Sequence, residues 1–230
     1  MRTIIVFLIY VIIVIGLTPF LLICYPLKIR QPFIAVGKAA MRLGQKILGL
    51  KIEVSGVEKI DRKSTYVFMA NHLSFLDGPM LFMLIPQAVR VILKKEVYRI
   101  PIVGWGMHHV EFVPVDRKGI RGGKKSIDEA SRLIKEKGYS FLIFPEGTRS
   151  RDGKIQAFKR GGFFLALESQ APIVPISIKG TFGLMPKGSF FVRRGKIDVA
   201  FQSPVSVQGY NRDTMEKLIE KVRSIIQAAL

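Results

Sequence analysis

The residues from Ile4 to Tyr25 form an apolar run that contains no charged side chain. About 20 such residues make a helix long enough to cross the hydrocarbon of a bilayer, so the run requires either a membrane or a large core. The stretch Gly16-Leu17-Thr18-Pro19 interrupts the run and predicts a position at which the helix kinks or turns back. A cleaved signal peptide is a poorer match, because the run is long and no small-x-small site follows it.

A second helix is expected from Phe33 to Leu50. Its basic residues recur at every fourth position and form one stripe: Lys38, Arg42 and Lys46. The chain has no acidic residue before Glu53. A helix with apolar surface and a cationic stripe can lie in the membrane interface, with its cations on anionic headgroups. The alternative is a hydrophobic hairpin that is buried within the fold and leaves its lysines in water.

Charge and cysteine content narrow the classes of partner. The chain has 36 Lys and Arg against 17 Asp and Glu, a formal net charge of +19, which favours an anionic membrane, a phosphorylated substrate or nucleic acid. Because the basic flank follows the apolar run, the positive-inside rule places the rest of the chain on the cytoplasmic face of the cell membrane. Cys24 is the single cysteine, which excludes a disulfide framework and a cysteine-based metal site. We therefore predict membrane-attachment helices in residues 1–50 and one globular domain in residues 51–230.

From Lys51 onward, short apolar runs alternate with helical stretches, which is typical of an α/β domain. Seven strands are expected, at residues 52–55, 66–70, 90–93, 110–115, 140–144, 173–178 and 196–201. Helices are expected to begin near Pro79, Ser126, Arg160 and Asp213.

Local patterns refine this outline. Ser126-Ile127-Asp128-Glu129 is a capping-box pattern, and Gly138 lies where the same helix would end. The prolines in and before the strand at 173–178 favour an edge or a bulge. His108-His109 precedes the strand at 110–115, and adjacent residues of a strand point to opposite faces. No further ligands stand at metal-binding spacing, so no metal centre is expected there.

The segment Asn71-His72-Leu73-Ser74-Phe75-Leu76-Asp77 directly follows the apolar run at 66–70. A carboxylate that binds one nitrogen of an imidazole fixes its tautomer, and the other nitrogen can then take a proton from a hydroxyl at neutral pH. His72 and Asp77 are therefore candidate catalytic residues. Taken alone, such a pair is more often a loop histidine beside a capping or solvated aspartate.

The strand at 140–144 runs into Pro145-Glu146-Gly147-Thr148-Arg149-Ser150. Ligands of α/β sheets gather beyond the carboxyl ends of strands. Gly147 allows close approach of a backbone, Thr148 offers a hydroxyl, and Arg149 presents a fork that suits a phosphate. The alternative for Glu146 and Arg149 is a surface ion pair.

The run from Phe112 to Arg117 leads into a loop that is dense in basic residues and glycines. Its cations are Arg117, Lys118, Arg121, Lys124 and Lys125, and its glycines are Gly119, Gly122 and Gly123. The composition favours a phosphate-binding loop, although the spacing fails the Walker A pattern. For Lys118 and Arg121 individually, a solvated basic loop is the preferred interpretation.

Together, these segments resemble the glycerolipid acyltransferase family, specifically its 1-acylglycerol-3-phosphate acyltransferases. The family's Asn-His-x4-Asp motif matches Asn71 to Asp77, and its Phe-Pro-Glu-Gly-Thr-Arg-Ser motif matches Phe144 to Ser150 residue for residue. Its aromatic-hydrophobic run ending in arginine is similar to Phe112 to Arg117, where Pro114-Val115 intervene before Asp116. Its Val-Pro strand is similar to Val174 to Gly180, and the similarity extends over roughly residues 51–203.

The resemblance implies an α/β fold of the glycerolipid acyltransferase type, a single catalytic domain with a mixed central sheet flanked by helices, preceded by the N-terminal hydrophobic hairpin. It also implies transfer of a fatty acyl group from acyl-CoA or acyl carrier protein to the 2-hydroxyl of lysophosphatidic acid, making phosphatidic acid for phospholipid biosynthesis without a cofactor. In that reaction His72 is the general base and Asp77 orients it, and no acyl-enzyme forms. The residues implied in substrate binding are Arg117, Glu146, Gly147, Thr148 and Arg149, with Lys124 and Lys125 as possible contacts for donor phosphates.

Two alternatives remain open at the level of sequence. The first is a different acceptor, because glycerol 3-phosphate and other lysolipids are handled by proteins with the same motifs. A non-catalytic, membrane-bound lipid-binding protein would also carry a high positive charge. Nucleic acid is not expected as a partner, because no basic strip is interleaved with aromatic residues.

Overall fold

The computed structural model describes residues 1–116 and 120–230. The strands in this part of the chain are β1 (Leu50–Ser55), β2 (Val67–Ala70), β3 (Val89–Lys94), β4 (Val113–Val115), β5 (Ser140–Ile143), β6 (Ile173–Lys179) and β7 (Gly195–Phe201). They form one sheet in the order β1-β7-β6-β2-β5-β3-β4. The strands from β6 to β4 in this order are mutually parallel, β7 is antiparallel to β6, and β1 is parallel to β7. The prediction of a mixed central sheet is confirmed, and each strand overlaps the segment expected for it.

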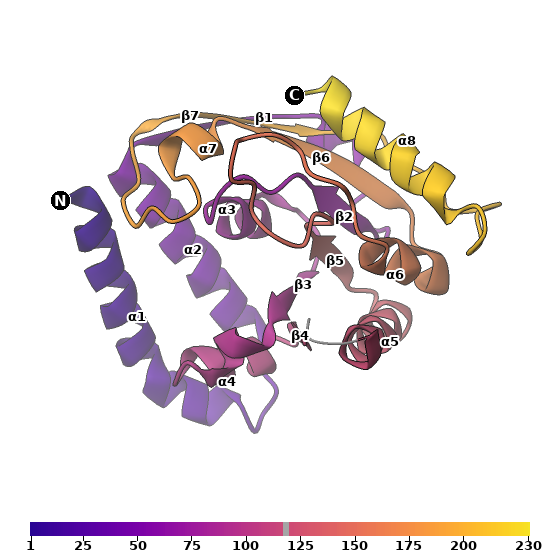
Figure 1. The fold of residues 1–230 in the computed structure, drawn as a ribbon. Coiled ribbons are helices and arrows are strands. Elements are labelled where there is room, and N and C mark those ends of the chain that lie inside the picture. The colour runs from indigo at the N-terminus through magenta and orange to yellow at the C-terminus, as the bar shows by residue number, and fades with distance from the viewer. Residues whose placement is uncertain (117–119) are drawn as a thin grey trace.

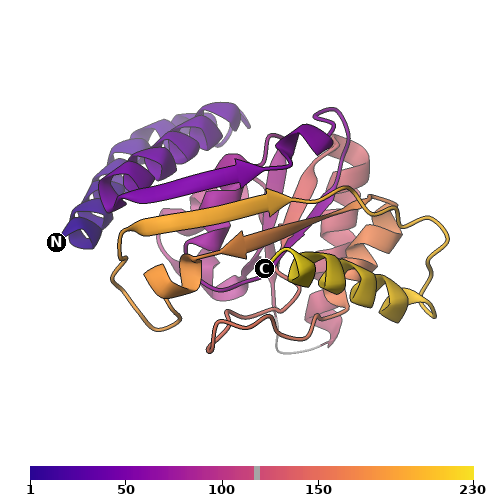
Figure 2. The same cartoon turned by 90° about the horizontal axis from the view of Figure 1, so that it is seen from above.

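Helices cover both faces of the sheet (Figures 1 and 2). The α-helices are α1 (Arg2–Cys24), α2 (Gln31–Leu48), α3 (Asp77–Leu84), α4 (Val103–His109), α5 (Ile120–Lys137), α6 (Gly161–Ser169), α7 (Thr181–Leu184) and α8 (Met215–Ala228). Two short 3-10 helices are η1 (Val57–Lys59) and η2 (Lys95–Arg99). Helices α2 and α3 contribute to one hydrophobic cluster, whereas α5, α6 and α8 contribute to a second.

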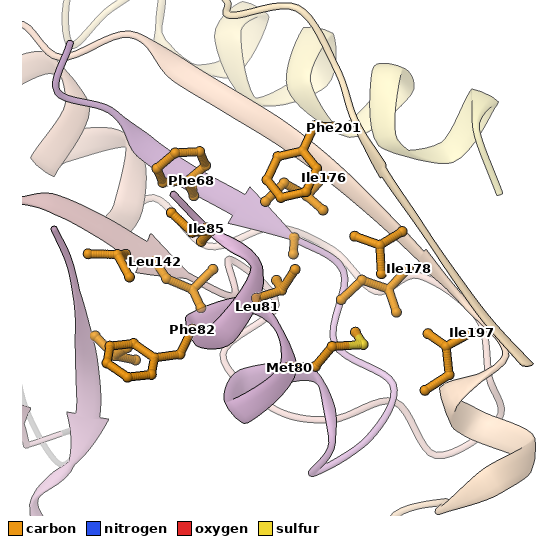
Figure 3. Close-up of a cluster of buried hydrophobic side chains, with 14 of the residues drawn as sticks. Phe68, Met80, Leu81, Phe82, Ile85, Leu142, Ile176, Ile178, Ile197 and Phe201 are labelled. Carbon is orange, nitrogen blue, oxygen red and sulfur yellow. The ribbon is translucent and has the colours of Figure 1, made fainter. Parts of the chain in front are cut away.

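Strand β2 lies between these two clusters. Phe68 and Ala70 belong to the cluster that includes α3, which Figure 3 shows, and Val67 and Met69 belong to the cluster of α5, α6 and α8. Successive side chains of a strand point to opposite faces, so a strand covered on both sides is apolar at every position. All four residues are fully buried. This rigid strand delivers the chain to the loop that begins at Asn71.

Of the edge or bulge expected at 173–178, the edge is wrong, because β6 lies in the interior of the sheet between β7 and β2. Pro175 is tolerated because of its position in the ladder. Its register partner in β2 is Met69, and its carbonyl accepts a hydrogen bond from the N–H of Gln202, immediately beyond β7. The proline therefore lies just beyond the last paired residues of the β6–β7 ladder, and the N–H that it lacks would have faced Gln202 and not β2.

The expected start of a helix at Ser126 is also wrong. Helix α5 begins at Ile120, so Gly122 through Lys125 are helical and do not form a phosphate-binding loop. The Ser126 hydroxyl donates to the carbonyls of Pro114 and Gly122, at 2.7 and 3.0 Å, and ties α5 to β4 instead of capping the helix. The predicted end is confirmed, since Gly138 has a left-handed φ of 64° and donates to Ile134.

The two adjacent histidines end a helix and do not lie on a strand. His108 and His109 close α4, and the chain reverses through Glu111, whose φ is +58°. Strand β4 consequently starts only at Val113. The buried His109 ring bonds through Nε2 to the carbonyl of Ile29, at 2.8 Å.

Helix α1 runs without interruption to Cys24, and the chain reverses only in the turn that follows, not at Pro19. Beside the proline, the Thr18 hydroxyl donates to the carbonyl of Val14, a further hydrogen bond within the helix. Helix α1 is long and apolar enough to cross a membrane, and little of its surface is buried against the protein.

The hairpin of α1 and α2 lies along one side of the domain and is held at both ends (Figure 1). At its start, Thr3 Oγ1 accepts the N–H of Val192, at 3.0 Å. At the turn, Arg30 Nε donates to the carbonyl of His109, at 2.9 Å. Within the basic stripe, Lys38 turns inward and donates to the carbonyl of Ile85, contrary to the headgroup role expected for it, whereas Arg42 and Lys46 are exposed.

Candidate active site

The candidate catalytic pair lies beyond the carboxyl end of β2. His72 belongs to the loop after this strand, and Asp77 is the first residue of α3. His72 Nδ1 lies 3.0 Å from Asp77 Oδ2. The same oxygen accepts the N–H groups of Leu73 and Ser74, both at 2.7 Å. Asp77 is fully buried, so three donors converge on a carboxylate that is shielded from water.

This arrangement defines what the imidazole can do. With Nδ1 facing the carboxylate, the proton of neutral His72 resides on Nδ1, and Nε2 is left as an acceptor. The ring stacks on Phe144, with centroids 4.0 Å apart and an interplanar angle of 19°. Its side chain is 20% exposed and borders a cleft. A hydroxyl placed in this cleft can therefore give its proton to Nε2.

The loop after β5 holds the backbone of His72 from both sides. Since β2 and β5 are adjacent and parallel, their following loops leave the same edge of the sheet. Glu146 Oε1 accepts the N–H of His72 at 2.8 Å, and Ser150 donates its N–H to the carbonyl of His72, also at 2.8 Å. The second carboxylate oxygen of Glu146 accepts the backbone and side-chain N–H groups of Gln156, at 3.1 and 3.0 Å.

The hydrogen-bonding capacity of the Glu146 carboxylate is thus used mainly by donors within the protein. Burial raises the pKa of the Glu146 carboxyl, and the hydrogen bonds from His72 and Gln156 oppose that rise by stabilising the charged form. Both carboxylate oxygens have protein donors, so the residue positions His72 in this structure. The sequence predicts a substrate-binding role for Glu146, and its partner Gln156 has no signal in the sequence.

Asn71 extends the sheet by means of its side chain. Its Nδ2 donates to the carbonyl of Ile178 at 3.0 Å, and its Oδ1 accepts the N–H of the same residue at 2.8 Å. The amide thereby replaces a backbone group in the β2–β6 ladder, which ends at Ala70 and Ile176. Because Asn71 is completely buried, this contact fixes the position from which His72 departs.

Gly147 lies at a turn that other residues adopt only with strain. Its φ is +71°, and a Cβ placed there would lie 3.1 Å from Cδ and Nζ of Lys159. Lys159 also donates its backbone N–H to the carbonyl of Pro145, at 2.8 Å. The glycine therefore lets the lysine chain pack over the turn, next to the loop that carries Thr148 and Arg149.

Arg149 and a lysine from a distant segment lie close together on this loop. Within the described residues, no protein group pairs with the Arg149 guanidinium, which lines the cleft. Lys187 Nζ donates to Thr148 Oγ1 at 2.9 Å and to the carbonyl of Arg149 at 3.3 Å. Lys187 has no signal in the sequence, because it follows the Val-Pro strand segment in a loop without a pattern of its own. The nearby Met185 carbonyl accepts the hydroxyl of Ser74, at 2.8 Å.

Of the other predicted binding residues, Arg117 lies outside the residues that the structure describes. Lys124 is exposed and lines the cleft from the start of α5. Lys125 is exposed at the adjacent helical position. The structure thus brings His72, Arg149 and Lys124 to one cleft.

That cleft has a volume of about 1390 Å³, more than a drug-sized ligand requires. Its lining is predominantly apolar and comes from α2, α3, β3 and the region of η2 and α4. Representative residues of its wall are Phe33, Met41, Pro79, Phe82, Ile100 and Met107. His72, Arg149, Lys124 and Lys159 add polar and cationic groups to this lining, which makes the cleft suitable for a molecule with a long apolar tail and an anionic head.

Comparison with known proteins places this geometry in a family. Residues 51–179 match the family model described as Acyltransferase. A 1-acyl-sn-glycerol-3-phosphate acyltransferase of Limnanthes douglasii is 34% identical over 179 residues, covering 78% of this chain and 63% of that protein. One from Saccharomyces cerevisiae is 33% identical over 180 residues, covering 77% of this chain and 59% of that protein. The chain therefore spans less than two thirds of the length of these curated relatives.

A solved structure is similar over nearly the whole chain. It is the crystal structure of the 1-acyl-sn-glycerophosphate (LPA) acyltransferase PlsC from Thermotoga maritima, with a TM-score of 0.84 and 26% sequence identity. The match covers 99% of this chain and 92% of that one, so it includes the hairpin as well as the sheet. The predicted glycerolipid acyltransferase type of fold is confirmed. From the family model, the relatives and the shared fold, it follows that this chain belongs to the acyltransferase family.

Proposed function

We propose that this protein transfers a fatty acyl group from a thioester to the 2-hydroxyl of 1-acylglycerol 3-phosphate and so makes phosphatidic acid. One observation carries the proposal: the free face of an Asp77-bound imidazole opens onto the same cleft as the Arg149 guanidinium. The names of the curated relatives and of the Thermotoga maritima structure support the choice of acceptor.

The reaction begins when the 2-hydroxyl lies against Nε2 of His72. As its proton passes to Nε2, the hydroxyl oxygen attacks the carbonyl carbon of the thioester, and Asp77 stabilises the imidazolium that forms. The tetrahedral intermediate then collapses, the C–S bond breaks, and the departing sulfur takes the proton from His72. No acyl-enzyme is needed, because the Ser74 hydroxyl donates to Met185 and Cys24 is buried in α1.

The phosphates and the acyl chains of the two substrates bind to different parts of the cleft. The phosphate of the acceptor is held by Arg149 and Arg117, with the Thr148 hydroxyl at the same turn. The apolar part of the cleft receives acyl chains, since each methylene removed from water contributes about 0.8 kcal/mol. Lys124 and Lys125, on the rim formed by α5, contact the phosphates of acyl-CoA or of acyl carrier protein.

The hairpin of residues 1–50 attaches residues 51–230 to the cytoplasmic face of the cell membrane. Its exposed surface is apolar, and Arg42 and Lys46 contact anionic headgroups. The contact of Thr3 with Val192 keeps the start of α1 beside the domain, so the hairpin lies along the domain over its length. Lipid substrates then reach the cleft without passing through water.

Product analysis with purified protein tests the proposal. Lysophosphatidic acid and glycerol 3-phosphate are each offered with acyl-CoA and with acyl carrier protein as donor. Phosphatidic acid is expected from the first acceptor alone. Acylation of glycerol 3-phosphate at a comparable rate would contradict the acceptor assignment, and no product from any pairing would contradict the activity.

Replacing Arg149 with alanine is expected to raise the KM for lysophosphatidic acid by roughly 10- to 100-fold, because a charge-assisted hydrogen bond to the phosphate is lost. The kcat should change far less, since His72 and Asp77 remain in place. Initial rates at varied acceptor concentration measure both. Arg151, an exposed neighbour in the same loop, provides the matched control, and Arg151→Ala should leave the KM unchanged. An unaltered KM in Arg149→Ala would refute the phosphate assignment.

Replacing Lys187 with methionine is expected to raise the same KM by about tenfold, because the loop at Thr148 and Arg149 loses its cross-link. Methionine retains an apolar chain of similar length, so the packing is conserved. Lys217→Met, at an exposed position of α8, is the control. The positioning role is wrong if Lys187→Met binds the acceptor as tightly as the control does.

A further inference from the structure

The loop between α7 and β7 displays two adjacent aromatic side chains to solvent. Phe190 is 85% exposed and Phe191 is 62% exposed. The turn that carries them is held by its own hydrogen bonds: Ser189 Oγ accepts the N–H of Phe191 and donates to its carbonyl, at 3.1 and 2.9 Å. Exposed aromatic side chains on an ordered turn are typical of a surface that contacts a protein partner or a membrane.

The base of this loop is attached to the hairpin. Val192 donates its N–H to Thr3 Oγ1 and packs against the core, and Arg193 donates its N–H to the carbonyl of Leu184, at 2.9 Å. In both views of the fold, the loop lies beside the N-terminal end of α1 (Figures 1 and 2). The exposed apolar residues of the first turns of α1, among them Ile4 and Phe7, therefore continue the surface of the loop.

Positive charge surrounds the two phenylalanines. Arg193 and Arg194 follow them after Val192 and are exposed, and Arg2 and Arg194 both approach Gly49 at the end of α2. In the described part of the chain, none of these three arginines forms an ion pair. A basic rim around aromatic side chains is complementary to anionic headgroups above an apolar interior.

We propose that residues 188–194 form a second membrane-contacting element, which inserts Phe190 and Phe191 into the interface of an anionic bilayer next to α1. A bilayer is favoured over a protein partner because the aromatic pair continues the apolar surface of α1, the helix with the length and composition of a membrane segment. Arginine chains extend along apolar surface while their heads remain at the phosphates.

The other end of this loop reaches the active site. Met185 accepts the hydroxyl of Ser74 in the His72 loop, and Lys187 binds the loop of Thr148 and Arg149. Insertion of the phenylalanines therefore sets the distance of two loops from the headgroups, the loop of His72 and the loop of Thr148 and Arg149. The membrane contact itself does not depend on the proposed function, although this consequence does.

Depth-resolved fluorescence quenching tests the insertion. Trp105 is the only tryptophan, so Phe190→Trp and Phe191→Trp are each made together with Trp105→Phe in the full chain. Gln208→Trp in the same background is the control, because the loop between β7 and α8 lies at the opposite end of the molecule (Figure 2). Each protein is reconstituted in vesicles of phosphatidylglycerol and phosphatidylcholine that carry acyl chains brominated at defined depths.

Tryptophans at positions 190 and 191 are expected to be quenched by shallow bromines, at roughly 5–10 Å below the headgroups, as for other interfacial elements. The control at position 208 should respond only to an aqueous quencher. If positions 190 and 191 behave like position 208, the proposal is overturned. Protection from the aqueous quencher without quenching by brominated lipid would also overturn it, in favour of a protein contact.

A second variant connects insertion with turnover. The double substitution Phe190→Ser and Phe191→Ser should lower acylation of vesicle-embedded lysophosphatidic acid by about tenfold, since two apolar anchors are removed. Acylation of the same lipid dispersed in detergent should be unchanged. Equal rates for variant and wild type in vesicles would refute the link between insertion and turnover. If the wild type acylates neither form, the proposed function fails while the quenching result stands.

Discussion

The His72→Ala variant is expected to lose acyl transfer by roughly 10²–10⁴-fold while it remains folded, because general-base catalysis typically contributes that factor. The imidazole hydrogen-bonds Asp77 and stacks on Phe144. The backbone bonds to Glu146 and Ser150 do not require the ring, so the loop should retain its path. Steady-state rates with lysophosphatidic acid measure the loss, and thermal unfolding measures the fold.

His108→Ala is the matched control, since His108 is exposed at the end of α4. It should retain wild-type turnover. Retention of more than a small residual rate in His72→Ala, at normal thermal stability, would show that another group removes the proton. A parallel loss in the control would point to a general effect on folding.

The Asp77→Asn variant is expected to lose turnover on the order of 10²-fold, and its cause should be electrostatic. The three donors around Asp77 all address Oδ2, so the amide oxygen of asparagine can take that place and keep His72 oriented. What disappears is the negative charge beside the imidazolium that forms during the reaction. Binding of the acceptor should therefore persist while kcat falls.

The kcat and KM of Asp77→Asn, measured together, check this expectation. Asp213→Asn, at an exposed position before α8, should change neither constant. An Asp77→Asn enzyme with near-wild-type kcat would mean that the carboxylate only stabilises the loop at Leu73 and Ser74. A large rise in KM at constant kcat would mean that Asp77 serves substrate binding.

Local pattern was sufficient for much of the fold. Short apolar runs between helical stretches located all seven strands in the described part of the chain. Strands buried on both faces, such as β2, require apolar side chains at every position, and β7 shows the alternation of a strand buried on one face. Gly138 marked the end of α5 because its left-handed φ suits glycine. The start of α5 was misplaced, since Ser126 uses its hydroxyl for Pro114 in the neighbouring strand, a contact that no local pattern reveals.

The active site also contains some contacts that the local sequence predicts and others that depend on the fold. His72 and Asp77 are close in sequence, so a short loop brings them together and their pairing could be predicted. Glu146 and His72 are separated by 74 residues and meet because β2 and β5 are neighbours in the sheet. Lys187 reaches Thr148 from the loop between α7 and β7, a contact that depends on the fold and that the local sequence does not indicate.

By itself, the sequence determined that this chain is an α/β protein with an apolar, acid-free hairpin and with a histidine and an aspartate in one short segment that follows a strand. These properties follow from composition and from contacts over a few residues, where chain geometry leaves little choice. Only the tertiary structure decided that Glu146 and Ser150 hold the backbone of His72, that Lys187 supports Arg149, and that Phe190 and Phe191 lie beside α1. The order of strands in the sheet brings these distant segments together, and that order depends on packing across the whole domain.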